Sequence, residues 1–97
     1  MAKGYWISFY HSITNRDALA EYAAAAGPAI RANGGRFLAR GAPTGAYEAA
    51  IQERTVIIEF DSVDRAISAY ESSEYQAARK LLDGVAVRDV RIIEGIE

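Results

Sequence analysis

The side chains best suited to chemistry lie around the connection between two expected strands. Arg40 closes the strand 36–40 and Arg54 opens the strand 54–60. An antiparallel connection returns to the same end of a sheet, so we expect the two arginines to be neighbours, with Glu48 folding back between them. Two guanidinium groups can hold an anionic or carbonyl-bearing ligand through paired N–H donors, and a carboxylate beside them can act as a base.

A structural interpretation of the same residues stays open. An Arg–Glu pair can fix a loop to the edge of a sheet, and Arg40, Glu48 and Arg54 could serve only that purpose. As a ligand site, the arrangement assigns substrate binding to Arg40, Arg54 and Tyr70, with Glu48 as a catalytic base. Tyr70 fits both interpretations, because a tyrosine at helical spacing belongs either to a core or to a pocket for a planar ligand.

His11 is the only histidine and stands where the first strand ends. Imidazole changes its charge near neutral pH, so His11 is a second candidate for a catalytic base, at the rim of a cavity between sheet and helices. The alternative is an exposed residue at the entry to a loop. One histidine, no cysteine and no close cluster of carboxylates do not make a coordination sphere, so we expect no metal and no cofactor.

Glu59 is unusual because it lies between Ile58 and Phe60 in a strand expected at the centre of a sheet. A carboxylate there points either to water or into a cavity that would raise its pKa. A partner on a neighbouring strand, Arg36 or Arg40, is the simpler expectation.

Length and composition limit the class of protein. The 97 residues suffice for one domain, expected to span residues 1–97. The chain is 51% apolar and 25% charged, which is typical of a globular domain. Its net charge of -2 argues against nucleic-acid partners, since phosphate binding needs a basic surface. No apolar run is long enough for a bilayer or a signal peptide, so we expect a cytoplasmic protein with no membrane partner.

Hydrophobic spacing predicts four strands, at residues 3–11, 36–40, 54–60 and 87–94. Residues 46–51 are ambiguous between strand and loop. A first helix follows Thr14, which forms a capping box with Asp17, and ends at Asn33-Gly34-Gly35. Gly27-Pro28 either kinks this helix or begins a new segment.

A second helical region lies between the third and fourth strands. Asp61 and Ser62 offer an N-cap for it. Ser73 with Gln76 fits a further capping box, so the region is interrupted before Ser73, and Gly84 ends it.

The order βαββαβ is typical of a ferredoxin-like α+β fold, with a four-stranded antiparallel sheet and the helices on one face. The first and third strands lie at the centre. Both carry large apolar residues on both faces, Trp6-Ile7 in one and Val56-Ile57-Ile58 in the other, although the helices cover only one face. We therefore expect a second copy of the chain to cover the other face, giving a homodimer.

Several segments, spread over nearly the whole chain, resemble the DUF1330 family. They are Gly4-Tyr5-Trp6, Gly34-Gly35-Arg36-Phe37-Leu38 with Arg40-Gly41, Ile58-Glu59-Phe60 and Ser73-Glu74-Tyr75-Gln76-Ala77-Ala78. The resemblance implies a dimeric α+β barrel, in which two ferredoxin-like units pack sheet against sheet. Arg40, Glu48 and Arg54 match positions where that family usually has the same residues.

The resemblance implies no particular activity. The wider superfamily includes cofactor-independent monooxygenases, haem-degrading enzymes and lactone isomerases, so the fold does not select among them. Two hypotheses follow. The first is a cofactor-independent enzyme acting on a small, partly apolar metabolite held between sheet and helices. The second is a non-catalytic homodimer that binds a small molecule or is only structural.

Overall fold

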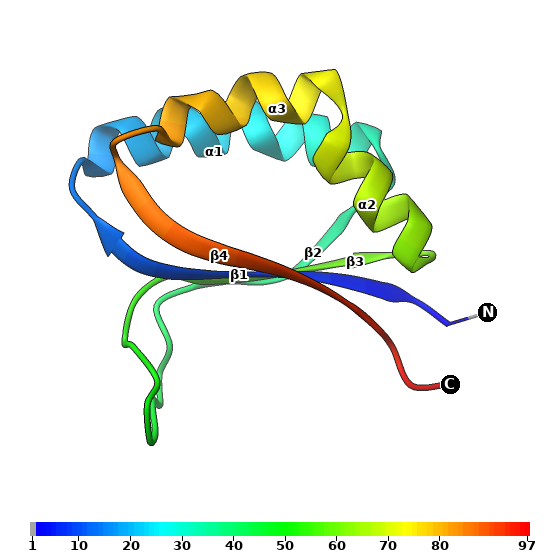
Figure 1. Cartoon of the computed structure of the whole chain (residues 1–97), viewed down its shortest axis with the longest axis horizontal. Helices are drawn as coiled ribbons and strands as arrows, with labels where there is room; N and C mark the ends of the chain where they lie inside the picture. Colours follow the sequence, from blue (N-terminus) through cyan, green and yellow to red (C-terminus); the bar gives the residue numbers. More distant parts are fainter. Residues whose placement is uncertain (1) are drawn as a thin grey trace.

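The computed structural model describes residues 2–97 and confirms the predicted order of strands and helices. The elements are β1 (Gly4–Ile13), α1 (Arg16–Ala32), β2 (Arg36–Gly41), β3 (Thr55–Phe60), α2 (Val63–Glu71), α3 (Ser73–Arg79), the short 3-10 helix η1 (Lys80–Leu82) and β4 (Ala86–Glu94). The helices lie together on one face of the sheet, as the ferredoxin-like α+β fold requires (Figure 1). No helix in the described part of the chain is long and apolar enough to cross a bilayer.

The four strands form one antiparallel sheet in the order β2-β3-β1-β4, with β1 and β3 at the centre as expected. The register brings Trp6 of β1 opposite Ile58 of β3 and Ile92 of β4. Tyr10 of β1 lies opposite Arg88 of β4. Because side chains alternate along a strand, Trp6, Tyr10 and Arg88 all project toward the helices.

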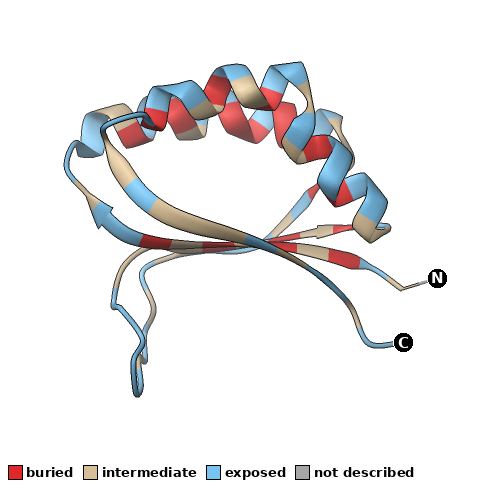
Figure 2. Ribbon diagram, in the orientation of Figure 1, coloured by how far each residue is buried: buried red, intermediate tan, exposed pale blue. Residues whose placement is uncertain are grey.

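The core fills the layer between helices and sheet, and the helix faces turned toward the sheet are buried (Figure 2). At its centre, the Trp6 ring stacks on Phe60 and meets the Tyr75 ring edge-on, with 4.7 Å between the latter ring centres. Tyr22 is also buried, and Tyr70 packs against Trp6 from the border of the core. Each fully buried side chain of this size stabilises the fold by roughly 1.5–3 kcal/mol.

The cap of α1 differs by one residue from the sequence prediction. Asn15, not Thr14, is the N-cap, and its side-chain oxygen accepts the N–H of Ala18 at 3.0 Å. Thr14 instead donates both its backbone N–H and its hydroxyl to the carbonyl of Val85, next to β4. Thr14 therefore ties the end of β1 to the start of β4 and is not free to cap the helix.

The second helical region is also capped one residue earlier than predicted. Ser72, not Ser73, caps α3 by accepting the N–H of Tyr75. The Gln76 side chain does not return to the cap, because it donates to the carbonyl of Tyr70. Ser62 caps α2, as one of the two residues expected there.

Helix α1 runs through Gly27-Pro28 without a break, so no new segment begins there. Pro28 has no N–H to offer the carbonyl of Ala24, and its ring is exposed. The helix ends at Asn33, and the chain turns back through Gly34, whose φ is +93°. A Cβ on Gly35 would lie 2.5 Å from the Ile30 side chain, so glycine is needed for β2 to approach α1 this closely.

Residues 42–54, which connect β2 to β3, project from the sheet on the side away from the helices (Figure 1). Residues 46–51 form turns and irregular backbone, with no strand. Within them Glu48 adopts a φ of +57°, and the Tyr47 side chain is 81% exposed. The ambiguous segment is thus a loop.

The sheet face without helices is called the open face. On the central strands, Ile7 and Phe9 of β1 and Ile57 of β3 belong to it and are only partly buried. At the edge, Ile93 of β4 is 58% exposed. The two-sided apolar pattern of the central strands therefore leaves an uncovered apolar surface, as the sequence predicts.

Candidate functional site

Arg40 and Arg54 lie together, as the antiparallel connection predicts. Arg40 is opposite Val56, two residues after Arg54. The Arg54 carbonyl accepts the N–H of Tyr10 at 3.0 Å, which fixes the Arg54 backbone against β1. Both arginine side chains line the same two hollows between the sheet and α1.

The first hollow, here called the inner cavity, lies inside the layer between α1 and the sheet. Its volume is about 20 Å³, enough for about one water molecule. The second, the mouth recess, lies between α1 and the two arginines Arg40 and Arg54 and measures about 590 Å³. Ala23, Gly27, Arg40 and Arg54 border both, so they form the partition between the recess and the cavity.

Helix α1 leaves room for the inner cavity because its residues there are small. Ala23, Ala26 and Gly27 line the cavity, in a segment whose alanines also favour the helix. A Cβ on Gly27 would meet only the flexible guanidinium of Arg31, at 3.2 Å. A larger side chain at these helix positions would therefore reduce the cavity.

The inner cavity is lined by three arginines, Arg40, Arg54 and Arg88, and by no acidic side chain among the described residues. Arg40 lies over the Phe37 ring, 5.0 Å from its centre. Within residues 2–97, neither Arg40 nor Arg54 forms an ion pair. The buried Nε of Arg54 has no hydrogen-bond partner there either. These cations therefore have N–H donors for which the described protein supplies no acceptor.

Arg88 is a site residue that the sequence interpretation missed. Its guanidinium donates to the hydroxyl oxygens of Tyr22, at 3.2 Å, and of Tyr75, with a longer contact of 3.5 Å to Ser8. Burial works against the charge of Arg88, but its interactions with the tyrosines raise its pKa above the ordinary value. Arg88 therefore stays cationic throughout the physiological range.

Alternation along β4 is the signal that could have found Arg88. Val90 and Ile92 pack against the core, and Arg88 lies two residues before Val90, on the same face. A cation on the core face of a strand needs partners, and this condition marks Arg88 as a candidate.

The tyrosines around Arg88 do not neutralise it. Burial raises the pKa values of Tyr10, Tyr22 and Tyr75, so all three stay uncharged. The hydroxyls of Tyr22 and Tyr75 hydrogen-bond to each other at 2.8 Å. Among the described residues, only cationic and neutral groups thus surround the inner end of the cavity.

Tyr70 does not lie beside Arg40 and Arg54. It lines a different hollow, the β4 recess, which measures about 620 Å³ and also includes Arg79 and Arg88. Arg88 therefore borders both the inner cavity and the β4 recess. The structure brings Tyr70 toward Arg88 and not toward the arginine pair of the mouth.

Glu48 is exposed in the 42–54 connection and lines neither the inner cavity nor the mouth recess. The carboxylate that reaches the mouth is Glu53. It accepts the backbone N–H of Arg54 at 3.0 Å and a guanidinium N–H of Arg16 at 3.3 Å. The hydrogen bond from the Arg54 backbone, helped by Arg16, lowers the pKa of Glu53.

His11 lies on the open face, not at a cavity between sheet and helices, because it alternates with Tyr10, which faces the helices. Its Nε2 hydrogen-bonds to Asp89 at 2.8 Å, and its side chain is 42% exposed. That hydrogen bond, together with Arg91, lowers the pKa of Asp89. The pair borders a recess of about 290 Å³ formed with the 42–54 connection.

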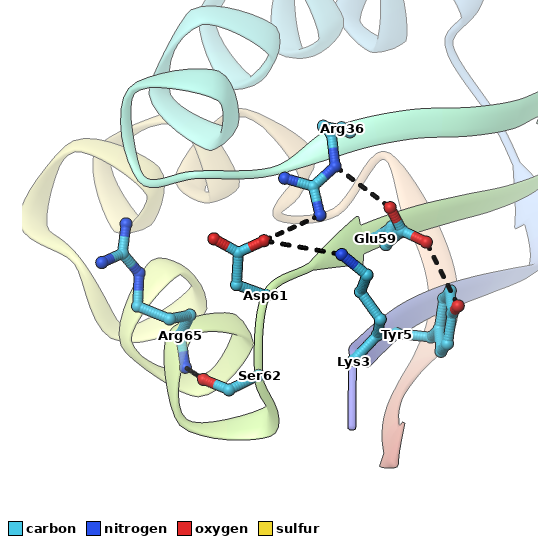
Figure 3. Close-up of polar contacts among 7 residues, drawn as sticks. All are labelled: Lys3, Tyr5, Arg36, Glu59, Asp61, Ser62 and Arg65. Carbon is cyan, nitrogen blue, oxygen red and sulfur yellow. Dashed lines mark hydrogen bonds and ion pairs between the residues drawn. The ribbon is translucent and has the colours of Figure 1, made fainter. Parts of the chain in front are cut away.

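Glu59 finds the expected partner, Arg36, in a network that joins β1, β2 and β3 (Figure 3). The Arg36 Nε donates to Glu59 at 3.0 Å, and the Tyr5 hydroxyl donates to the other carboxylate oxygen at 3.2 Å. Asp61 accepts from Arg36 and pairs with Lys3. The Arg36 hydrogen bond lowers the pKa of Glu59, which excludes the raised pKa that a cavity would have caused.

The described residues contain no group of three or more histidine or carboxylate side chains arranged to hold a metal ion. Residues 3–96 match the sequence model of a family described as a domain of unknown function, DUF1330. No curated protein sequence matches the chain.

Solved structures share the fold. A protein of unknown function from Rhodopseudomonas palustris has a TM-score of 0.72 at 15% identity, over 99% of this chain and 84% of the other. A dimeric ferredoxin-like protein of unknown function from Thermobifida fusca has a TM-score of 0.66 at 16% identity, over 96% and 91%. SnoaB, a cofactor-independent oxygenase from Streptomyces nogalater, has a TM-score of 0.69 at 9% identity, over 100% and 96%. At these identities the likeness concerns the fold alone.

Proposed function

The chain belongs to the DUF1330 family, a domain of unknown function, and from its site we propose that it binds a small, partly apolar metabolite in the inner cavity. The ligand enters through the mouth recess, where Arg40 and Arg54 meet its anionic or carbonyl group. Both residues border the recess and the cavity, so a ligand that passes between them contacts both guanidinium groups.

The observation that carries this proposal is the unmatched arginine pair. A buried guanidinium is normally matched by a carboxylate, yet the partly buried Arg54 has none among residues 2–97, and neither has the exposed Arg40 beside it. The buried Nε of Arg54 also lacks an acceptor. A bound oxygen atom would supply that acceptor and remove the desolvation penalty of the unpaired donor.

Apolar walls support a ligand that is only partly polar. Trp6, Ile58 and Phe37 line the inner cavity beside the arginines. Because the cavity is small as it stands, a metabolite needs the Arg40 and Arg54 side chains to swing outward, and no ion pair within the described chain holds them in place.

An enzymatic form of the proposal needs no cofactor. Arginine and tyrosine donors around a cavity can stabilise negative charge that develops on a substrate oxygen. The fold is shared with SnoaB, which is a cofactor-independent oxygenase. His11 and Glu48 face away from the inner cavity, so a base for such a reaction would come from the substrate itself or from a group other than these two. Without turnover, the same site serves as a binding module.

We also propose that a second copy of the chain covers the open face. Ile7, Phe9, Ile57 and Ile93 leave an apolar surface there, and a similar fold from Thermobifida fusca is dimeric. The network of Arg36 with Glu59 and Asp61 in Figure 3 and the His11–Asp89 pair lie at two ends of this face, where a polar rim is expected.

A stability screen tests the binding proposal. The melting temperature of the wild-type protein is measured with a library of small acids, ketones and aldehydes, since a ligand at 100 times its Kd adds about 2.7 kcal/mol. Each compound that raises it is repeated with Arg40→Ala and with Arg65→Ala, an exposed arginine on α2 as control. We expect the first variant to lose the shift and the second to keep it. A library without any stabilising compound, or a shift that survives Arg40→Ala, would contradict the proposal.

A further inference from the structure

We propose that the inner end of the cavity is an oxyanion site, in which Arg88 holds an ionised oxygen of the ligand such as a carboxylate. This inference rests on the proposed function, which leaves open whether the ligand presents an anion or a neutral carbonyl group. The surroundings of Arg88 decide in favour of the anion.

The charge of Arg88 is not matched by an anion of the described chain. The side-chain hydrogen bonds of Arg88 all go to hydroxyl oxygens, and within residues 2–97 it forms no ion pair. Its guanidinium carbon lies 5.5 Å from the centre of the Tyr10 ring and 5.2 Å from that of Tyr22. Aromatic faces attract the cation but carry no net charge. A partly buried cation held only by neutral groups is completed by an anion.

The hydroxyl groups around Arg88 have hydrogens left to donate. Tyr22 and Tyr75 have two hydroxyl hydrogens, and the bond between them uses one. The other has no acceptor among the described residues. The Ser8 hydroxyl accepts from Trp6 at 2.9 Å and from Arg88, and its own hydrogen likewise has no acceptor in that part of the chain. The inner end therefore offers several donors and needs an acceptor-rich group, which an oxyanion supplies better than a carbonyl.

The path from outside to the inner cavity is lined by arginines. Arg16, Arg31, Arg40 and Arg54 line the mouth recess; Glu53 beside it pairs with Arg16, and among the described residues the other three arginines have no carboxylate partner. Further inward, the Arg54 guanidinium lies over the Tyr10 ring, and the Arg88 guanidinium lies against the same ring. The chain as a whole has a net charge of -2, but the route into this cavity is positively charged. This local charge favours the entry of anions.

The sole tryptophan makes the test direct. Trp6 lines the inner cavity, so its fluorescence reports binding there. The wild-type protein is titrated with acetate and acetamide, and with benzoate and benzamide, which form acid and amide pairs of nearly equal size. We expect the acid of at least one pair to bind about tenfold or more tightly than its amide, the ratio that one charge-assisted hydrogen bond supplies.

Variants assign this preference to a residue. Arg88→Met should lose the tenfold preference for the acid, whereas Arg65→Met, on the exposed side of α2, should keep it. If Arg88→Met does not fold, the side-chain N–H resonances of Arg88 in the wild-type protein give the same answer. They should shift when benzoate is added and stay in place when benzamide is added.

The failures of the two proposals are distinguishable. Equal binding of acid and amide, or an acid preference that survives Arg88→Met, overturns the oxyanion site while the ligand still occupies the cavity. An acid preference lost in Arg54→Met but kept in Arg88→Met places the anion at the mouth and also overturns it. If no probe changes the Trp6 emission and the metabolite screen finds no ligand, the proposed function itself fails.

Discussion

Arg54 and Arg88 lie against the same aromatic ring, with their guanidinium carbons 6.0 Å and 5.5 Å from the centre of the Tyr10 ring. Arg54 leads into β3 and Arg88 belongs to β4, the two strands that flank β1. The π face of Tyr10 attracts both cations, but it does not remove the repulsion between them. Because the two cations repel each other, replacing either arginine should weaken ligand binding without lowering the free energy of unfolding.

Replacing Arg54 by methionine should abolish binding of a ligand found by the stability screen. The free energy of unfolding should stay within about 1 kcal/mol of wild type or rise, because the change removes a cation whose buried Nε lacks a partner. Urea denaturation measures the stability, and Arg65→Met is the matched control. A loss above about 2 kcal/mol would show that Arg54 is a structural residue.

Replacing Gly27 by leucine should block the passage between mouth recess and inner cavity, because Gly27 borders both. The protein should remain folded, since leucine is a better helix former than glycine by about 1 kcal/mol. Ligand-induced stabilisation should disappear in Gly27→Leu and persist in Ala25→Leu, whose site on α1 is exposed and lines neither hollow. Undiminished binding by Gly27→Leu would mean that ligands enter elsewhere, as through the β4 recess.

Replacing Ile57 by aspartate should convert a dimer into a folded monomer. Ile57 lies on the open face, where a stable interface should bury roughly 1,200 Å² or more in total. Sedimentation at micromolar concentration measures the mass, and Ile67→Asp, at an exposed position of α2, serves as the control. A wild-type species of 10.6 kDa under these conditions would contradict the dimer.

Replacing Glu59 by glutamine should reduce the dependence of the free energy of unfolding on pH in the acid range. Arg36 lowers the pKa of Glu59 in the folded protein, so the ion pair stabilises above the unfolded pKa, about 4.3, and is lost as the pH falls through the lower folded value. The variant should be less stable than wild type at pH 7, and the two should converge in acid. Glu53 and Asp89 also have lowered pKa values, so some acid dependence remains.

Denaturation curves between pH 2 and pH 7, a range of about 5 pH units around these carboxylate pKa values, give the comparison. Glu71→Gln, at an exposed position without an ion pair among the described residues, should keep the wild-type dependence. A difference between Glu59→Gln and wild type that persists unchanged into acid would show that the carboxylate charge is not what stabilises this network.

Replacing Pro28 by alanine should stabilise the protein by about 1 kcal/mol, because residue 28 then donates to the Ala24 carbonyl within an unbroken helix. Greater freedom of the unfolded chain offsets part of that gain. Urea denaturation measures the difference. The Pro28 ring is exposed, and a clear loss of stability on its removal would show that the ring packs against the core.

The order of elements could be predicted because apolar residues recur at strand and helix spacing along nearly the whole chain. The caps were wrong by one residue because Thr14 and Asn15, like Ser72 and Ser73, are adjacent residues that can both cap. Which of them does so depends on a distant partner: the Val85 carbonyl engages Thr14. Local sequence does not contain that information.

The candidate site was predictable only where strand ends determine it. Arg40 and Arg54 are neighbours because an antiparallel pair brings them together. The position of Glu48 depends on how a loop folds, and that of Tyr70 on how α2 crosses the sheet, and neither follows from spacing. Arg88 escaped attention because a charged residue near the start of an edge strand resembles an ordinary surface position.

The two properties of the inner cavity come from separate parts of the chain. Ala23, Ala26 and Gly27 of α1 leave room for a guest once Arg40 and Arg54 swing outward, whereas the charge that the guest meets comes from arginines on and beside the strands. A substitution on that helix face can therefore admit a larger or smaller molecule without altering which chemical group is bound. Divergence within such a scaffold, or its redesign, can change ligand size and ligand charge independently.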